Sequence, residues 1–230
     1  MLFFTDAQTA VSSLCLCNIN SYPPAGKHVT FIDPGVMELR THDEYRNIDR
    51  LHALAHDLPP RTFISIDYPS DMCIEKQDEF ILKSWYNNVF YQDIPRYICT
   101  VQFRWQDAGS FMSWWKKHRP LWEGTGRVVA LGNMCRILWP NTFTDLVFDT
   151  VLRDPPGWLH VYGMGMRLMR KYVPMFDEMG ARISVDSTKW TRIRRGSWRT
   201  HDRIHCTKEN RDDFFLDYVA ALQEFTAVAY

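Results

Sequence analysis

A strand–helix–strand pattern in the second half of the chain constrains the fold most. Residues 159–163 and 183–186 begin as short β-branched or aromatic segments, and each ends abruptly in Gly or Asp. Residues 167–179 between them have the apolar spacing of an amphipathic helix. Two strands joined in this way run parallel, and in a barrel their carboxyl ends face the active site. Asp186, at the end of the second strand, is therefore a candidate catalytic carboxylate from its position alone.

The same alternation of strands and helices continues along most of the chain. We expect clear strands at residues 28–33, 62–67, 97–102, 128–132, 159–163 and 183–186. Helical patterns occupy residues 43–56, 77–90, 110–117, 144–152, 167–179 and 212–229. Residues 2–5 form a further candidate strand, and another is expected within 193–205. The first 17 residues are interpreted as a strand followed by a short helix.

Repeated β-α units require a parallel sheet whose two faces are covered. Eight strands would close a (β/α)₈ barrel, and a chain of 230 residues is long enough for a compact one. We therefore predict a single domain at residues 1–230, a small TIM-like barrel with irregular first and last units. An open, doubly wound sheet is the alternative, but the Gly-rich dinucleotide fingerprint expected after its first strand is missing.

Charge is distributed unevenly along this chain of zero formal net charge. The segment 189–211 carries eight basic residues against Asp202 and Glu209, a formal charge of +6, so the rest of the chain carries −6. Such a segment is typical of a polyanion-binding surface, although a solvated face is the simpler alternative. The six cysteines show no CxxC pair, and no apolar run approaches the length of a membrane span. We expect a cytoplasmic protein with free thiols, in the host cytoplasm if the protein is viral.

Polar residues and glycines cluster at the predicted strand ends. In a parallel barrel these positions converge on one side: Asp33, Asp67, Gln102, Gly132, Gly163 and Asp186. Neighbouring carboxylates repel each other, which separates their pKa values and allows one to act as nucleophile and another as acid and base. The alternative is that each aspartate caps the helix that follows its strand.

Six collinear segments of the chain resemble the tRNA-guanine transglycosylase superfamily. They read FIDPG at residues 31–35, IDYPSDMC at 66–73, VQ at 101–102, ALGNMCR at 130–136, LHVYGMG at 159–165 and SVDSTKW at 184–190. The match runs from about residue 28 to residue 195. It is closest to the branch of phage and bacterial proteins that insert 7-deazapurines into DNA.

The resemblance implies catalytic roles for two carboxylates. Asp186, which precedes Ser-Thr-Lys-Trp, matches the family's aspartate nucleophile. Asp33 matches the aspartate of the Asp-Ser-Gly-Gly motif, which serves as general acid and base. The implied enzyme is a pentosyltransferase of the guanine transglycosylase type.

The resemblance also implies a set of base-binding residues. Asp67, or else Asp71, matches the carboxylate that reads the guanine edge, and Gln102 matches the amide that assists it. The remaining matches are Gly132 and Gly163, whose backbone lies against the base, and Tyr162 and Met37, which sandwich the heterocycle.

The chain departs from the family pattern in two places. The turn after Asp33 reads Pro34-Gly35-Val36-Met37 in place of Ser-Gly-Gly-Phe. The family's structural zinc motif is absent, because Cys206 is the only cysteine that follows Asp186. We therefore expect no zinc subdomain, no metal and no other cofactor.

The predicted function is exchange of guanine in DNA, or less favourably in tRNA, for a free 7-deazaguanine base. The nucleic acid would be held by basic residues directly after the nucleophile: Lys189, Arg192, Arg194, Arg195 and Arg199. A homodimer or an accessory protein is left open as a further partner. The alternatives are a metal-dependent barrel hydrolase and a catalytically silent nucleic-acid-binding relative.

Overall fold

Strands and helices alternate along the chain, and the paired strands run parallel to their neighbours. The computed structural model describes residues 1–5, 9–19, 26–34, 44–70, 74–135, 137, 139–186, 207 and 209–230, without the side chains of 18 and 44–47. Parallel strands with intervening helices confirm the predicted α/β class.

The larger sheet has five strands in the order β1-β8-β7-β6-β5. They are β1 (Leu2–Phe4), β5 (Cys99–Val101), β6 (Val128–Leu131), β7 (Trp158–Val161) and β8 (Ile183–Asp186). From β5 to β8 each strand pairs with the next one along the chain, as expected for successive β-α units. The N-terminal strand β1 then lies beside β8, with Phe4 opposite Asp186.

The smaller sheet has three strands in the order β2-β3-β4: β2 (Leu14–Asn18), β3 (Val29–Asp33) and β4 (Thr62–Ile64). Isolated parallel bridges connect it to the larger sheet at both edges. Thr5, directly after β1, bridges to Cys15 in β2, and Ile64 in β4 bridges to Tyr97, just before β5. The backbone N–H groups of Leu16 and Ile98 donate across these two junctions, each over 2.7 Å.

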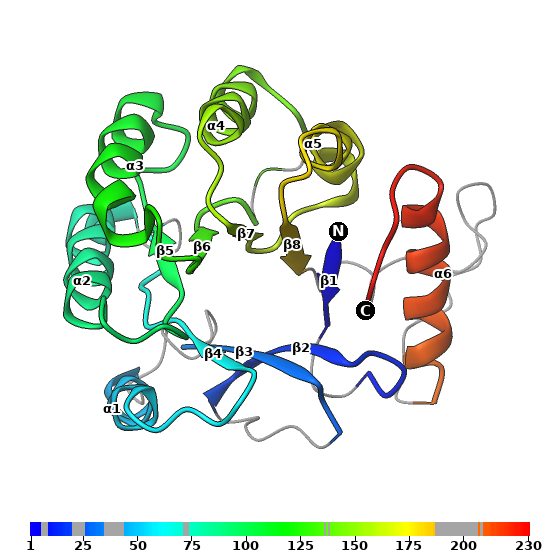
Figure 1. Ribbon diagram of the computed structural model, residues 1–230, viewed down its shortest axis with the longest axis horizontal. Coiled ribbons are helices and arrows are strands. Elements are labelled where there is room, and N and C mark those ends of the chain that lie inside the picture. The colour runs from blue at the N-terminus through cyan, green and yellow to red at the C-terminus, as the bar shows by residue number, and fades with distance from the viewer. Residues whose placement is uncertain are drawn as a thin grey trace.

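The helices lie outside the strands (Figure 1). They are α1 (Glu44–Ala55), α2 (Gln77–Phe90), α3 (Ala108–Trp122), α4 (Thr142–Arg153), α5 (Met166–Glu178) and α6 (Arg211–Gln223), and a short 3₁₀ turn, Ile74–Lys76, precedes α2. Side chains cap the N-termini of α3 and α4, since Asp107 accepts from Ser110 N–H and Asn141 from Thr144 N–H, both over 2.9 Å.

Apolar side chains form clusters on both faces of the strands. One outer cluster joins β1 and β5–β8 to α3–α6, and a second joins β2–β4 to α1. The inner cluster takes residues from both sheets. Within it Phe31 of β3 lies 4.2 Å from Phe4 of β1 and 5.3 Å from Trp158 of β7, between ring centroids. The inner faces of the two sheets therefore pack against each other.

The structure corrects four sequence predictions. The strand expected at 62–67 ends at Ile64, and the helix expected at 110–117 runs from Ala108 to Trp122. The predicted short helix near the N-terminus is wrong, because residues 14–18 form strand β2. The predicted helix at 212–229 ends at Gln223, after which the chain returns to β1, where the Phe3 N–H donates to Ala229 O. The strand expected within 193–205 lies outside the described residues.

Candidate active site

The strand ends bring the predicted polar residues to one side of the sheets. Asp33 and Asp186 are the last residues of β3 and β8, and Gln102 and Gly132 directly follow β5 and β6. Asp67 lies three residues after β4. Because the strands run parallel, these positions share the carboxyl side of the fold.

A buried carboxylate–amide pair forms the best-defined part of this region. Gln102 Nε2 donates to Asp67 Oδ2 over 2.8 Å, and the Ser65 hydroxyl donates to Asp67 Oδ1 over 2.6 Å. The Ser65 hydroxyl also lies 2.8 Å from that of Thr100. Asp67 is 6% exposed and Gln102 is 2% exposed, so both polar groups depend on protein partners.

The loops around Gln102 hold its amide in one orientation. The Ser70 N–H donates to Gln102 Oε1 over 3.4 Å, while the Ser70 hydroxyl donates to Phe103 O over 2.8 Å. Asn133 adopts a left-handed backbone conformation with φ of 60°, and its amide donates to Ser70 Oγ and to Phe103 O. Since Oε1 is committed as an acceptor here, Nε2 is the atom that faces Asp67.

The two predicted base-contacting glycines have close neighbours of their own. A Cβ at Gly132 would overlap the Gln102 amide, and a Cβ at Gly163 would overlap the Cys135 side chain. Gly163 also has a φ of +64°, which other residues rarely adopt. At both positions the missing side chain makes room for another part of the strand-end region.

Asp186 is anchored through one of its carboxylate oxygens. The Gly163 N–H donates to Asp186 Oδ1 over 2.9 Å. His160 Nε2 lies 3.3 Å from the same oxygen, with the His160 side chain fully buried and that of Asp186 13% exposed. The hydrogen bond from the Gly163 N–H therefore connects the end of β8 to the turn that follows β7.

Tyr162 lies close enough to two of the predicted carboxylates to be affected by their charges. Burial raises the pKa of Tyr162 well above its usual value, and the negative charges of Asp67 and Asp33 raise it further. Its ring packs edge-on against His160, with 4.7 Å between centroids. The structure thus brings Tyr162, Asp67 and Asp33 together, whereas its stacking on a base remains a prediction.

Asp71, Met37 and the five basic residues lie outside the described residues: Lys189, Arg192, Arg194, Arg195 and Arg199. The choice between Asp67 and Asp71 as base reader therefore rests on the geometry of Asp67 alone.

His160 is the neighbour of Asp186 that sequence reasoning missed. It pairs with Ser184 across β7 and β8, and alternation along β8 places Asp186 on the same side as Ser184. Alternation also places His160 and Tyr162 on one side of β7, so the sequence indicated which residues within each strand share a side. The register between the strands was the missing information.

Within the described ranges, no group of three or more His, Cys, Asp or Glu residues is placed to hold a metal ion. Among the described helices, none combines the length and apolar character needed to cross a membrane. Comparisons with protein-family models, with characterised proteins and with solved structures gave no match to the chain.

Proposed function

We propose that the protein is a base-exchange transglycosylase that replaces guanine in a nucleic acid with a 7-deazaguanine. The observation that carries this proposal is the buried Asp67–Gln102 pair on the same side of the strands as Asp186. The residues that recognise a flat, polar heterocycle would then lie beside a candidate nucleophile, and both would contact the same ligand.

The Asp67–Gln102 pair has the hydrogen-bonding capacity that a guanine edge requires. The Asp67 carboxylate accepts from Ser65 and Gln102. It can also accept from the N1–H and the exocyclic amino group of guanine, because each carboxylate oxygen can accept more than one hydrogen bond. The second hydrogen on Gln102 Nε2 can be donated to guanine O6. This arrangement suits 7-deazaguanines equally well, because they share that edge.

The first displacement forms a covalent glycosyl-aspartate. A lone pair on the Asp186 carboxylate attacks C1′ of the target nucleotide, and the C1′–N9 bond breaks with its electron pair leaving on guanine. Asp33, which begins as the carboxylic acid, supplies the proton that neutralises the departing guanine.

The second displacement restores the enzyme. The incoming 7-deazaguanine gives its N9 proton to the Asp33 carboxylate, and N9 then attacks C1′ while the Asp186 carboxylate leaves. Asp33 is thereby returned to the acid form, and two inversions at C1′ retain the configuration. No cofactor takes part in either step.

We also propose that the two sheets form one closed (β/α)₈ barrel within a single domain. The bridges at both sheet junctions and the inner cluster shared by the two sheets support this closure. In such a barrel Asp33, Asp67 and Asp186 lie around one mouth.

DNA is the proposed nucleic-acid substrate, with tRNA as the alternative. The target base must leave its stack to reach the strand ends, at a cost of a few kcal/mol that contacts to the nucleic acid must offset. The segment 189–211, with its formal charge of +6, directly follows β8 and would supply phosphate contacts. A phage or bacterial protein of this kind would act in the cytoplasm, alone or with a partner subunit.

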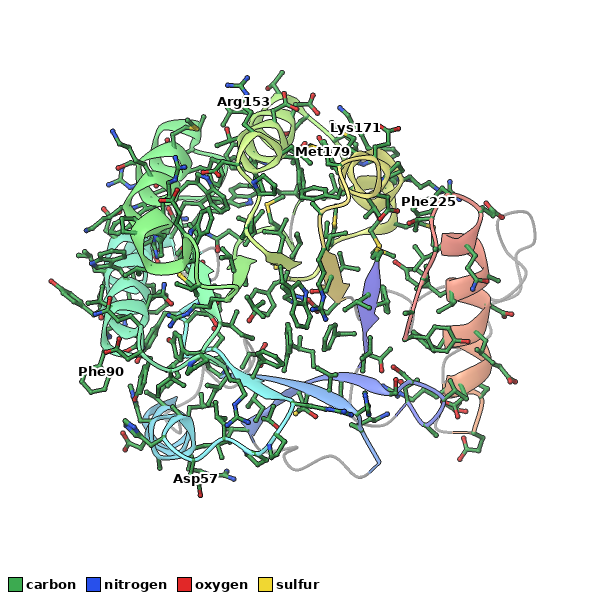
Figure 2. All side chains as sticks on the ribbon, in the orientation of Figure 1. Asp57, Phe90, Arg153, Lys171, Met179 and Phe225 are labelled. Carbon is green, nitrogen blue, oxygen red and sulfur yellow. The ribbon has the colours of Figure 1, made fainter. Side chains whose placement is uncertain are left out.

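The test is release of labelled guanine. DNA and tRNA carrying radiolabelled guanine are incubated with the protein and with candidate 7-deazaguanines, and label appearing in the free-base fraction is measured. Wild-type protein should release label from DNA, and Asp186→Asn should release none because an amide is not a competent nucleophile. The matched control is Asp57→Asn, at an exposed carboxylate on the outer side of the fold (Figure 2), which should match wild type. Absence of release by wild-type protein from both nucleic acids would reject the proposed function.

A further inference from the structure

A fully buried histidine connects the inner core to the proposed nucleophile. His160 is 0% exposed. Its ring contacts Phe31 and Phe4 edge-on, with centroids 5.0 Å and 5.7 Å apart. Its Nδ1 lies 3.0 Å from Ser184 Oγ, and its Nε2 lies 3.3 Å from Asp186 Oδ1. Both ring nitrogens therefore face a polar atom inside an otherwise aromatic environment.

The contacts of Ser184 favour a proton on one ring nitrogen of His160 over the other. The indole N–H of Trp158 can only donate, and it donates to Ser184 Oγ over 2.7 Å. The Ser184 hydroxyl proton is then directed to His160 Nδ1 at 3.0 Å or to Leu159 O at 3.3 Å. Donation to Nδ1 leaves the ring proton of a neutral imidazole on Nε2.

The carboxylate of Asp186 favours the same tautomer. An ionised carboxylate only accepts hydrogen bonds, so a bare Nε2 at 3.3 Å would set two lone pairs against each other. A protonated Nε2 makes an attractive contact with the charge. Among the described residues Nε2 is buried and makes no hydrogen bond, so its 3.3 Å contact with Oδ1 acts through charge alone.

We propose that His160 is a positioning residue for Asp186, presenting a protonated Nε2 to Oδ1 at 3.3 Å through a relay that begins at Trp158 and passes through Ser184. Oδ1 would then be held by the hydrogen bond from the Gly163 N–H and by the charge contact with His160, which fixes the carboxylate plane. Oδ2 is thereby assigned as the oxygen that attacks C1′. The positioning role rests on the proposed function, which makes Asp186 the nucleophile. The tautomer of His160 is independent of that function.

The tautomer can be read by nitrogen NMR of protein labelled at histidine side chains. We expect a protonated Nε2 and an unprotonated Nδ1 at His160, assigned by loss of its signals in His160→Gln. His118 provides an internal reference of the opposite kind. It is also buried, its Nδ1 lies 2.7 Å from Trp114 O, and the amide of Asn88 lies 3.0 Å from its Nε2. A bare Nε2 or a protonated Nδ1 at His160 would overturn the proposal.

Kinetics then separates positioning from packing. His160→Leu keeps an apolar side chain but removes the donor, and should lower kcat for guanine release about 10- to 100-fold with KM for the nucleic acid unchanged. His160→Gln retains an N–H donor and should recover most of that loss. The matched control His118→Leu removes a second buried imidazole and should lower the unfolding temperature without lowering kcat.

Equal loss of kcat in His160→Leu and His160→Gln, or a rise in KM alone, would reject the positioning role. The NMR result does not require turnover. If wild-type protein releases no guanine while Nε2 of His160 is protonated, the proposed function fails and the contact with Asp186 stands.

Discussion

The side-chain amide of Gln102 fills the space that a Cβ at position 132 would occupy. Gly132 follows β6, and Gln102 follows the neighbouring strand β5. The Gly132 N–H is also bound, to Val101 O over 3.1 Å. The backbone at position 132 therefore cannot easily move away, and any side chain added there must displace the amide that donates to Asp67.

Gly132→Ala should consequently weaken both base binding and the fold. Displacing a buried, hydrogen-bonded side chain in a packed region costs about 1–3 kcal/mol. We expect a lower unfolding temperature and weaker binding of 7-deazaguanine by calorimetry. Gly109→Ala is the control, because its Cβ would make only an ordinary contact, with the side chain of the N-cap residue Asp107, and should leave base binding unchanged. Unchanged base binding in Gly132→Ala would show that Gln102 does not read the base.

Asp67→Ala should weaken binding of the free base far more than binding of DNA. Its loss leaves the donors of the buried ligand unpaired, at about 1–3 kcal/mol or more. The two affinities are measured separately, by calorimetry for 7-deazaguanine and by fluorescence anisotropy for DNA. Asp71→Ala is the parallel variant. A larger effect of Asp71→Ala, or equal weakening of both ligands by Asp67→Ala, would move base reading away from Asp67.

Asp33→Asn should slow exchange without preventing formation of the covalent adduct. Acid and base assistance contributes about 10²- to 10⁴-fold to rate, so the rate of guanine release should decrease by a factor in that range. The adduct is detected by denaturing electrophoresis after rapid quenching, with Asp186→Asn as the negative control. If Asp33→Asn forms no adduct and also fails to bind the base, Asp33 is better assigned as a base reader.

Stability should fall in mild acid because of His118. Burial lowers the pKa of His118 to about 4, below the value of about 6.5 in an unfolded chain. Between these two pKa values the unfolded state therefore binds the proton more readily than the folded state. The contribution of neutral His118 to stability is complete above pH 6.5 and is lost as the pH falls toward 4. Urea unfolding at several pH values measures the slope, which should be shallower in His118→Gln. Equal slopes in both proteins would contradict this assignment.

Much of the fold follows from local patterns, and the exceptions have physical reasons. Strand β8 and helix α2 have the predicted bounds, because the apolar period of each segment is local and needs no information from distant residues. Strand β2 was missed because Leu14 and Leu16 join the inner cluster while Cys15 and Cys17 join an outer one. A strand that is apolar on both faces has no alternating signal.

The site was predictable to the extent that parallel strands share an end. That rule alone grouped Asp33, Asp67, Gln102 and Asp186. It could not reveal that Gln102 donates to Asp67, or that His160 lies beside Asp186, because both contacts depend on register and on side-chain direction between strands. Residues that touch through space but lie 24 or more positions apart leave no local signature.

The final prediction concerns the basic segment, whose arginines lie outside the described residues. If Arg194 and Arg195 neutralise phosphates, log affinity for DNA should fall linearly with log salt, at about 0.9 of a slope unit per phosphate on a duplex. The double variant Arg194→Ala/Arg195→Ala should bind DNA more weakly and with a shallower slope, while its affinity for free 7-deazaguanine stays at the wild-type value. Salt titrations of both proteins on duplex DNA and on tRNA measure this. Slopes that do not change on either nucleic acid would mean that the two arginines form a solvated face, and a change on tRNA alone would reject DNA as the substrate.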